Sequence, residues 1–227
     1  MKIALFGIPE IKPGKHNLKD PRLEQADKKT HAQVDVVGDD QLLQADAILA
    51  VDEAKADLIL KDLEFVETRL GRDAQPAERA ALEKIKLLLE SERFLFNSGL
   101  NPEDLQAVVA HSFYTNKPIT VAARHEVAHP EDLLLRAFAE AGYISFLTVG
   151  GKENRAWPIR KGTTAWEAAG TIHTDIQKGF IRAEVISFAD FTEAGGETQA
   201  KRAGKQRLEQ KQYVVQDYDL LNFRFNK

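Results

Sequence analysis

Two short runs of residues have the composition and spacing of motifs that carry chemistry in other proteins. The first, His125-Glu-Val-Ala-His129, matches the H-E-x-x-H pattern, in which one helix turns both histidines toward a zinc ion and the glutamate activates water. Pro130 directly follows His129, and a residue before proline is biased away from helical geometry. A predicted strand precedes the run, and no histidine lies between it and His173. The sequence therefore favours a chance match and no metal site, with a zinc hydrolase as the alternative.

The second run follows the apolar segment Lys2–Ile8, which predicts a strand. A phosphate-binding loop has the pattern G-x-x-x-x-G-K-[ST], whose spacing curls backbone N–H groups around phosphates and places a hydroxyl on magnesium. Here six residues separate Gly7 from Gly14-Lys15, two of them are prolines without an N–H, and His16 replaces the hydroxyl residue. We expect a strand followed by a turn. The alternative is a residual NTPase in which Gly14 and Lys15 form a rebuilt phosphate site.

The C-terminal part of the chain has the alternation and turn signals of a small mixed sheet. Four apolar or alternating runs predict strands, at 144–149, 155–162, 180–185 and 220–225. A Gly-Gly turn at 150–151 separates the first two, and Thr163 can cap a short helix that follows the second. Strand, strand, helix, strand and closing strand is the order of a β-grasp.

Several short sequence segments in this stretch match those of a known family, in the same order. They are Arg155-Ala-Trp-Pro-Ile-Arg-Lys-Gly162, Ala168-Ala-Gly-Thr-Ile-His-Thr-Asp175, Gly179-Phe-Ile-Arg-Ala-Glu-Val185, and Val215-Gln-Asp-Tyr-Asp219 with Phe223-Arg-Phe225. The stretch resembles the C-terminal TGS domain of the YchF family, which are Obg-related P-loop NTPases. Tyr218 stands where the family has a turn glycine. We expect Tyr218 to pull the backbone toward ordinary turn geometry, because a side chain disfavours positive φ. Asp217 and Asp219, beside this turn, are expected to be solvated, with paired carboxylates as the alternative.

Short segments before position 144 resemble parts of the same family's nucleotide-binding domain. Lys19-Asp-Pro-Arg-Leu23 is similar to a Pro-Asp-Pro-Arg-Leu segment that the family carries well after its phosphate loop. Gln33–Gly38 is similar to the strand that ends in the family's Asp-x-x-Gly switch motif. The resemblance implies that the phosphate loop and its first helix are missing here. It also places Arg124 and Val127 where an Asn-Val-x-Glu motif reads the purine base, so that this reader is lost as well.

Resemblance and helical periodicity together predict three parts and an α/β fold class (α+β overall). They are a reduced P-loop-NTPase-like α/β domain with a parallel sheet at 1–52 and 112–143, an inserted helical hairpin at 53–111, and a β-grasp TGS domain at 144–227. In the hairpin, apolar residues recur at helical spacing over 52–70 and 77–96, and Pro76 lies near the start of the second helix. A further helix is predicted from Asn101-Pro to about His111.

The composition predicts a packed cytoplasmic protein. Hydrophobic residues make up 43% and charged residues 29%, and the lack of cysteine excludes disulfides and thiolate chemistry. The first apolar run is too short for a signal sequence or a membrane span. Residues 145–227 carry 13 Lys/Arg and 10 Asp/Glu, against 18 and 25 in the rest of the chain. This asymmetry indicates a basic binding surface on the C-terminal part.

The YchF family couples purine-nucleotide hydrolysis to ribosome and stress functions. The resemblance implies that this chain acts in the same processes but lacks the nucleotide site. We therefore expect a binding or regulatory protein for ribosomes, structured RNA or a small regulatory ligand. No cofactor, catalytic residue, membrane or DNA partner is expected. The candidate RNA- or ligand-binding residues are Arg155, Arg160, Lys161, His173, Lys178 and Arg182. If nucleotide binding persists, its candidates are Gly14, Lys15 and Arg124.

The alternation after Gly179 places Arg182 on one face with Phe180 and Glu184, opposite three aliphatic residues, and so predicts an exposed cation. A competing interpretation pairs the C-terminal cations with Glu184, Glu167 and Asp175, where they only keep the domain soluble.

Three further features have two interpretations each. Trp157 and Trp166 are expected in the β-grasp core, with stacking on RNA as the alternative. His173 can cap a helix end or contact a ligand. The basic residues of the hairpin form either a solvated face or one wall of a cleft.

Overall fold

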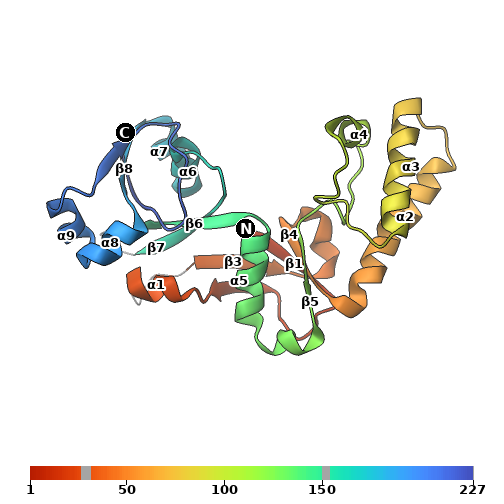
Figure 1. Ribbon diagram of the computed structural model, residues 1–227, viewed down its shortest axis with the longest axis horizontal. Coiled ribbons are helices and arrows are strands. Elements are labelled where there is room, and N and C mark those ends of the chain that lie inside the picture. Colours follow the sequence, from red (N-terminus) through yellow and green to blue (C-terminus); the bar gives the residue numbers. More distant parts are fainter. Residues whose placement is uncertain (27–31, 150–153, 227) are drawn as a thin grey trace. The chain divides into compact units, whose positions relative to one another are not determined.

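The computed structural model describes residues 1–26, 32–149 and 154–226 (Figure 1). The Gly-Gly turn predicted at 150–151 lies outside these residues. The chain forms two compact units, one of residues 2–14 and 35–133, the other of Met1 and residues 15–34 and 134–227. The three-part division drawn from the sequence stays a prediction.

The first sheet has the strand order β2-β3-β1-β4-β5. Its strands are β1 (Lys2–Phe6), β2 (Gly14–Leu18), β3 (Ala32–Val37), β4 (Ala47–Val51) and β5 (Ile119–Ala122). Strands β3, β1, β4 and β5 are parallel, with Ile3 opposite Ala47 and Ile48 opposite Ile119. β4 is buried at every position, because a central strand of a parallel sheet is covered on both faces. The predicted parallel sheet is confirmed.

Short helices follow β2, β3, β4 and β5. They are α1 (Pro21–Ala26) and the 3-10 helices η1 (Asp39–Gln44), η2 (Asp52–Ala54) and η3 (Arg124–Ala128). The chain leaves the first sheet through α5 (Pro130–Glu140), which begins at a proline. Proline is tolerated there, because the first N–H of a helix has no partner within the helix.

Helices α2 (Lys55–Leu70) and α3 (Pro76–Glu90) belong to the part of the chain that connects β4 to β5, and they pack against each other. Pro76 occupies the first turn of α3, as its fixed φ favours. Leu82, Ile85 and Leu89 recur at helical spacing and are buried in the core of this pair. The helix predicted to reach His111 is shorter, because α4 (Pro102–Ala107) ends where Val108 leaves helical geometry.

Asp62 on α2 anchors the chain that returns from α4 to β5. Its carboxylate accepts from the N–H groups of Tyr114 at 3.0 Å and Thr115 at 2.7 Å, and from the Thr115 hydroxyl at 2.7 Å. The side chain is buried. Burial raises the pKa of Asp62, and the three donors oppose this effect without cancelling it.

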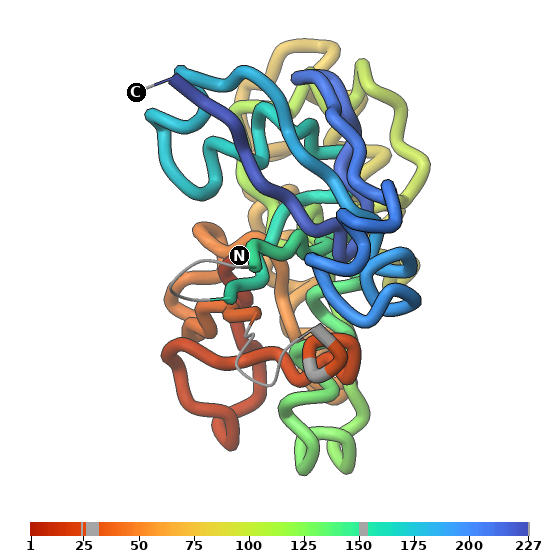
Figure 2. The backbone as a smooth tube through the Cα atoms, turned by 90° about the vertical axis from the view of Figure 1, so that its left-hand side faces the viewer, coloured from red at the N-terminus to blue at the C-terminus, as the bar shows by residue number. Residues whose placement is uncertain are grey.

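The second sheet has the strand order β7-β6-β10-β8-β9. Its strands are β6 (Tyr143–Thr148), β7 (Arg155–Arg160), β8 (Phe180–Ile186), β9 (Arg207–Glu209) and β10 (Leu220–Phe225). β6 and β10 are parallel and the other neighbours antiparallel. Figure 2 shows β10, in dark blue, running alongside β8. The predicted mixed sheet is confirmed.

Helix α6 (Ala165–Ile172) covers this sheet. Its alanines at 165, 168 and 169 are buried in one core with Phe146 and Phe223. Its N-cap is Thr164 and not Thr163, as the sequence had suggested. The reason is a Thr-x-x-Glu capping box, in which the Thr164 N–H donates to Glu167 at 2.8 Å and the Thr164 hydroxyl accepts from the Glu167 N–H.

Several short elements of the C-terminal part were not predicted. They are α7 (Thr174–Lys178), α8 (Phe188–Ala194), α9 (Glu197–Arg202) and the edge strand β9. The three helices are too short to show two full turns of hydrophobic periodicity, and β9 is too short for a clear alternation. Residues that begin and end them, such as Ser187 at the N-cap of α8 and Gly195 with a φ of 77° at its end, are the local signals.

A β-bulge corrects the predicted faces of β8. Arg182 pairs with Arg224, but Phe180 pairs with Phe225, so one strand has an extra residue between these pairs. Ile181 is that residue, and it is 45% exposed. Phe180 is thereby turned into the core with Ala183, although the alternation had placed it beside Arg182. The exposure predicted for Arg182 is confirmed.

The turn before β10 contradicts two predictions. Tyr218 has a φ of 65°, the left-handed geometry expected of a glycine, and its side chain is buried. Asp219 is buried rather than solvated, and it accepts from the Tyr213 hydroxyl at 2.7 Å and from the Gln216 N–H at 2.9 Å. Asp217 is partly exposed and accepts from the Ser145 N–H at 3.1 Å. These bonds fix the turn from both sides, which is why the tyrosine keeps a glycine conformation.

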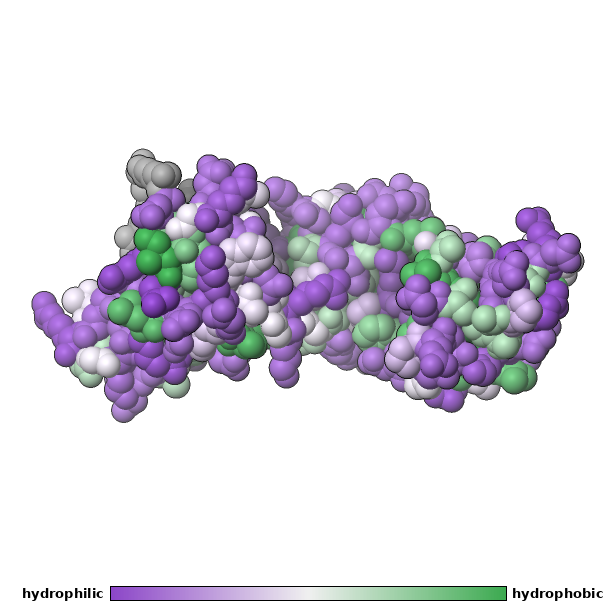
Figure 3. Space-filling model, turned by 90° about the horizontal axis from the view of Figure 1, so that it is seen from above, coloured by the Kyte–Doolittle hydropathy of each residue, from purple (hydrophilic) through white to green (hydrophobic). Residues whose placement is uncertain are grey.

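Hydrophilic residues dominate the face shown in Figure 3, where hydrophobic residues form only small patches. Exposed large apolar side chains include Leu87 and Val109, both on the segment between β4 and β5. Scattered exposed apolar residues are normal for a folded domain. Within the residues that the structure describes, no helix is both long and apolar enough to cross a membrane.

Candidate functional site

The H-E-x-x-H run lies on the 3-10 helix η3 and not on an α-helix. A 3-10 helix has three residues per turn, so positions i and i+4 are separated by about 120° around its axis. His129 has φ −119° and ψ 67°, outside the helical region, as Pro130 predicts. Glu126 is used locally, since it accepts from the Ala123 N–H at 2.7 Å. No group of three or more metal-ligating side chains lies together among the described residues.

The segment after β1 turns and leads into a second strand. Gly7 has a φ of 71°, and a Cβ there would lie 2.7 Å from that of Ala54, so this turn packs too closely for a side chain. Gly14 and Lys15 are the first residues of β2, and both are exposed. In a phosphate-binding loop the glycine-lysine pair leads into a helix whose N–H groups face the phosphates. Here that pair begins an extended strand.

Arg124 follows β5 and bonds to the turn after β1. Its Nη1 donates to the Gly7 carbonyl at 3.1 Å and to the Glu10 carboxylate at 3.2 Å, and its Nη2 lies 3.8 Å from the Glu53 carboxylate. This place, at the carboxyl ends of parallel strands, is where open α/β sheets bind ligands. In this chain two carboxylates already balance the guanidinium there.

Three candidate cations lie on or just after β7. The Arg155 guanidinium carbon is 4.0 Å from the centre of the Trp157 ring, and that of Arg160 is 4.9 Å from the Tyr143 ring. Stacking of this kind orients the planar guanidinium. Arg155, Arg160 and Lys161 are all exposed. Arg155 begins the edge strand β7, whereas Arg160 and Lys161 lie at its other end.

Arg182 lies opposite Arg224 on the neighbouring strand. Glu184 binds Arg224, whose Nε donates to its carboxylate at 2.6 Å, and it also accepts from Gln206 and Asn222 at 3.0 Å. Burial alone would raise the pKa of Glu184, but the bonds from Asn222 and Arg224 lower it below its ordinary value. Glu184 is therefore occupied by Arg224, which is not one of the cations that the pairing interpretation considered.

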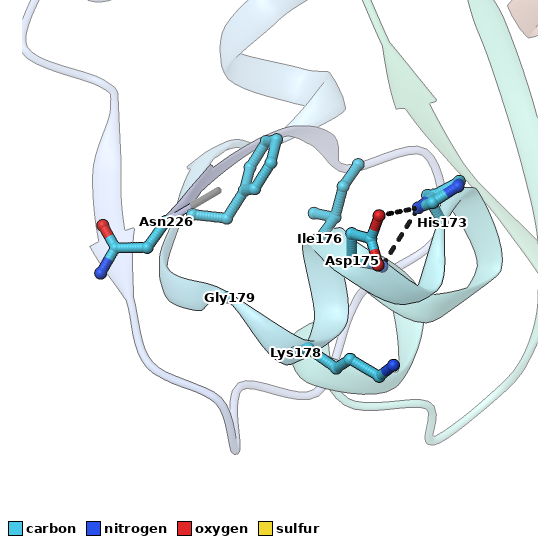
Figure 4. Close-up of a pocket in the computed structure, with 7 residues that line it drawn as sticks. His173, Asp175, Ile176, Lys178, Gly179 and Asn226 are labelled. Atoms are coloured by element: carbon cyan, nitrogen blue, oxygen red, sulfur yellow. Dashed lines mark hydrogen bonds and ion pairs between the residues drawn. The ribbon is translucent and has the colours of Figure 1, made fainter.

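His173 caps α7 through its ring. Its Nδ1 accepts from the Asp175 N–H at 3.1 Å and lies 3.5 Å from the Asp175 carboxylate, as the dashed lines in Figure 4 mark. Helix capping, one of the two interpretations of His173, is thus observed. Glu167 is held by Thr164. Two of the three carboxylates that the pairing interpretation assigned to the cations, Glu184 and Glu167, therefore have other partners.

His173 and Lys178 line the same pocket, which has a volume of about 780 Å³. Its remaining walls come from Asp175, Ile176, Gly179, Phe225 and Asn226 (Figure 4). A second pocket of about 470 Å³ shares Ile176 and Phe225 with it. Two of the predicted ligand-binding residues are therefore brought together by α7, next to the end of β10.

Sequence reasoning missed a second basic segment on the same sheet. It runs through α9 and β9 and includes Lys201, Arg202, Lys205, Arg207 and Lys211. Lys201 is bound to Glu197 at 2.6 Å and Lys205 to Asp190 at 2.9 Å. The close spacing of five cations was the available signal. Trp166, expected in the core, is instead 40% exposed at the start of α6, while Trp157 is partly buried against the core.

The fold defines a class of protein in which a parallel α/β sheet with an inserted helical pair precedes a β-grasp module. Residues 143–226 match the model of the family YchF-GTPase_C, described as a protein of unknown function (DUF933). The chain is similar to the "Ribosome-binding ATPase YchF" of Haemophilus influenzae, with 34% identity over 238 residues that cover 78% of this chain and 66% of the relative. The corresponding protein of Bacillus subtilis is 30% identical over 81% of this chain and 68% of the relative. The chain belongs to the YchF family.

Two further similarities agree with this assignment. A stretch of 98 residues is 49% identical to "Obg-like ATPase 1" of Danio rerio and covers 41% of this chain and 25% of that one. The solved structure of the Schizosaccharomyces pombe YchF GTPase has a TM-score of 0.75 at 18% identity, over 99% of this chain and 97% of that chain. The structural likeness establishes the fold.

Proposed function

We propose that this protein is a YchF-family ribosome- or RNA-binding regulator that acts through its C-terminal module and has lost the family's nucleotide site. The observation that carries the proposal is the course of the chain at Gly14-Lys15, which enters strand β2 where a phosphate loop enters a helix. Arg124 supports it, because its guanidinium is balanced by Glu10 and Glu53 at the carboxyl ends of β1 and β4.

The names of the relatives, which are ribosome-binding ATPases, support the ribosome as the proposed partner. Exposed cations of the β-grasp module supply the chemistry, since phosphate contacts of Lys and Arg provide most of the sequence-independent affinity for nucleic acid. Arg155 and Arg160 are stacked on aromatic rings and so are oriented before binding. Arg182 lies at the surface, so a phosphate can approach it without a buried-charge penalty.

The test is salt-dependent binding to purified ribosomes and to a structured RNA such as a tRNA transcript. Each lost phosphate contact lowers the slope of log affinity against log salt by about 0.7 to 0.9. Arg160→Ala combined with Arg182→Ala is therefore expected to weaken binding and to reduce that slope by about 1.4 to 1.8. Binding is measured by co-sedimentation for ribosomes and by anisotropy for RNA.

The matched control is Arg72→Ala combined with Arg79→Ala, which removes two exposed cations from the hairpin. It is expected to bind as the unaltered protein does. Equal losses in both double variants would move the binding surface to the hairpin. No binding of the unaltered protein at low salt would refute the proposed function.

A further inference from the structure

The pocket beside α7 is built by a close backbone approach. The Asn226 N–H donates to the Gly179 carbonyl at 2.9 Å, and a Cβ on Gly179 would lie 2.0 Å from the Asn226 carbonyl oxygen. Only glycine at position 179 therefore lets the end of β10 close against the end of α7. This contact brings Phe225 to the pocket that Lys178 and His173 line.

The polar groups of this pocket can bind an anion and also a neutral polar edge. Because Nδ1 of His173 accepts from the Asp175 N–H, the neutral ring carries its proton on Nε2 and offers it as a donor. Lys178 adds an exposed ammonium group. The exposed Asp175 carboxylate can accept a hydrogen bond. A simple anion would use only Lys178 and His173 and would leave the Asp175 carboxylate without a partner.

The apolar groups supply a stacking surface. Phe225 is 37% exposed although it is a large aromatic residue, and it lies between the pocket of 780 Å³ and the adjoining one of 470 Å³. Ile176 is shared by both pockets. Aromatic side chains at such positions stack on unpaired bases, because every base has a π face. The larger pocket falls within the roughly 300–1,000 Å³ typical of small-molecule sites.

We propose that this pocket binds one unpaired nucleotide, with its base against Phe225 and its phosphate at Lys178 and His173. Asp175 accepts from an amino group of the base or from a ribose hydroxyl. The nucleotide belongs to an RNA strand or is a free mononucleotide, and the RNA source rests on the proposed function. The site is distinct from the family's phosphate loop, since α7 and β10 lie in the second sheet's module.

The experiment measures anisotropy of a labelled single-stranded RNA of mixed sequence, with the 227-residue chain and its variants. Phe225→Ala is expected to weaken binding about tenfold, as loss of one base stack does. Phe225→Tyr keeps the ring and is expected to restore binding, which also controls for folding. Lys178→Ala is expected to weaken binding and to reduce its salt dependence. Val214→Ala removes another exposed apolar side chain of the module and is expected to have no effect.

Competition with AMP, CMP, GMP and UMP distinguishes the sources. Displacement of the RNA by millimolar mononucleotide, lost in Phe225→Ala, assigns a free nucleotide to the pocket. Binding of the RNA alone, with the same dependence on Phe225, assigns an unpaired nucleotide of a strand. Unaltered binding by both Phe225→Ala and Lys178→Ala overturns the inference. If the Arg160/Arg182 variant still loses ribosome affinity in that case, the proposed function stands without this pocket.

Discussion

The guanidinium carbon of Arg22 lies 4.0 Å from the centre of the Tyr218 ring, and Tyr218 holds a φ of 65°. Arg22 also bonds Asp20 at 2.6 Å and Asp217 at 2.7 Å, so it links α1 to the turn before β10. The Tyr218 hydroxyl bonds Asp20, and Phe188 packs 5.4 Å from the Tyr218 ring. A tyrosine in the left-handed region costs about 1–3 kcal/mol. The stacking, hydrogen bonding and burial around it offset this strain.

Tyr218→Gly is expected to destabilise the protein by about 2 kcal/mol, although it removes the backbone strain. Truncating a buried aromatic residue costs about 3–5 kcal/mol, and the relief of strain returns about 1–3. Tyr218→Phe keeps the ring and loses only the bond to Asp20, so a cost of about 1 kcal/mol is expected. Urea unfolding measures both. A glycine variant more stable than the unaltered protein would show that strain dominates at this turn.

Acid is expected to weaken the Arg22–Asp20 contact. Burial would raise the pKa of Asp20, but hydrogen bonds from Arg22 lower it below the ordinary value. The stability from this carboxylate is therefore present above its unfolded pKa of about 3.9 and is lost as the pH falls through the lower folded pKa. Between about pH 4 and pH 2, the free energy of unfolding should fall less for Asp20→Asn than for the unaltered protein. The limits of this pH range are good to about 1 pH unit. Urea unfolding across this range checks it.

Two buried carboxylates act in the opposite direction. Burial raises the pKa of both Asp62 and Asp219, so their protonated forms favour the folded state, and this contribution is lost as the pH rises through the folded pKa. They are left intact in the Asp20→Asn comparison, which isolates the Asp20 effect. Equal acid sensitivity of the two proteins would contradict the role given to Asp20.

Nucleotide binding is expected to be weak. Titration calorimetry with ATP and with GTP, each with magnesium, should show no micromolar binding, because Gly14-Lys15 begins a strand and Arg124 is already paired with carboxylates. Lys15→Ala should leave the calorimetric signal unchanged. A micromolar affinity with a stoichiometry near one, abolished by Lys15→Ala, would instead establish a rebuilt phosphate site.

Zinc is expected at less than one equivalent in the purified protein. His125 and His129 lie on a 3-10 helix and its end, where they do not share a face. His129→Ala should keep the circular dichroism spectrum and the thermal midpoint within a few degrees, as surface substitutions do. Elemental analysis measures the metal. Stoichiometric zinc that disappears in His129→Ala would reverse this interpretation.

The sequence by itself determined the elements whose signals are local. The apolar runs fixed β1, β4 and β10, because a strand buried on one or both faces has a readable pattern over four to six residues. Helical spacing located α2 and α3 and their buried leucines. Pro130 was sufficient to keep His129 out of helical geometry. Words of the β-grasp module identified the family, which the comparisons then established.

The tertiary structure alone decided which residues meet. Arg22 and Asp217 are 195 positions apart, and their contact fixes a tyrosine in a conformation that local preference disfavours. The bulge at Ile181 shifts one face of β8 because the partner strand, and not the alternation, sets the register. The end of β10 brings Phe225 to the pocket that Lys178 also lines, and a capping bond sets the His173 ring. Such pairings depend on packing between segments that are distant in the sequence. A local sequence pattern does not specify which distant residues will contact it.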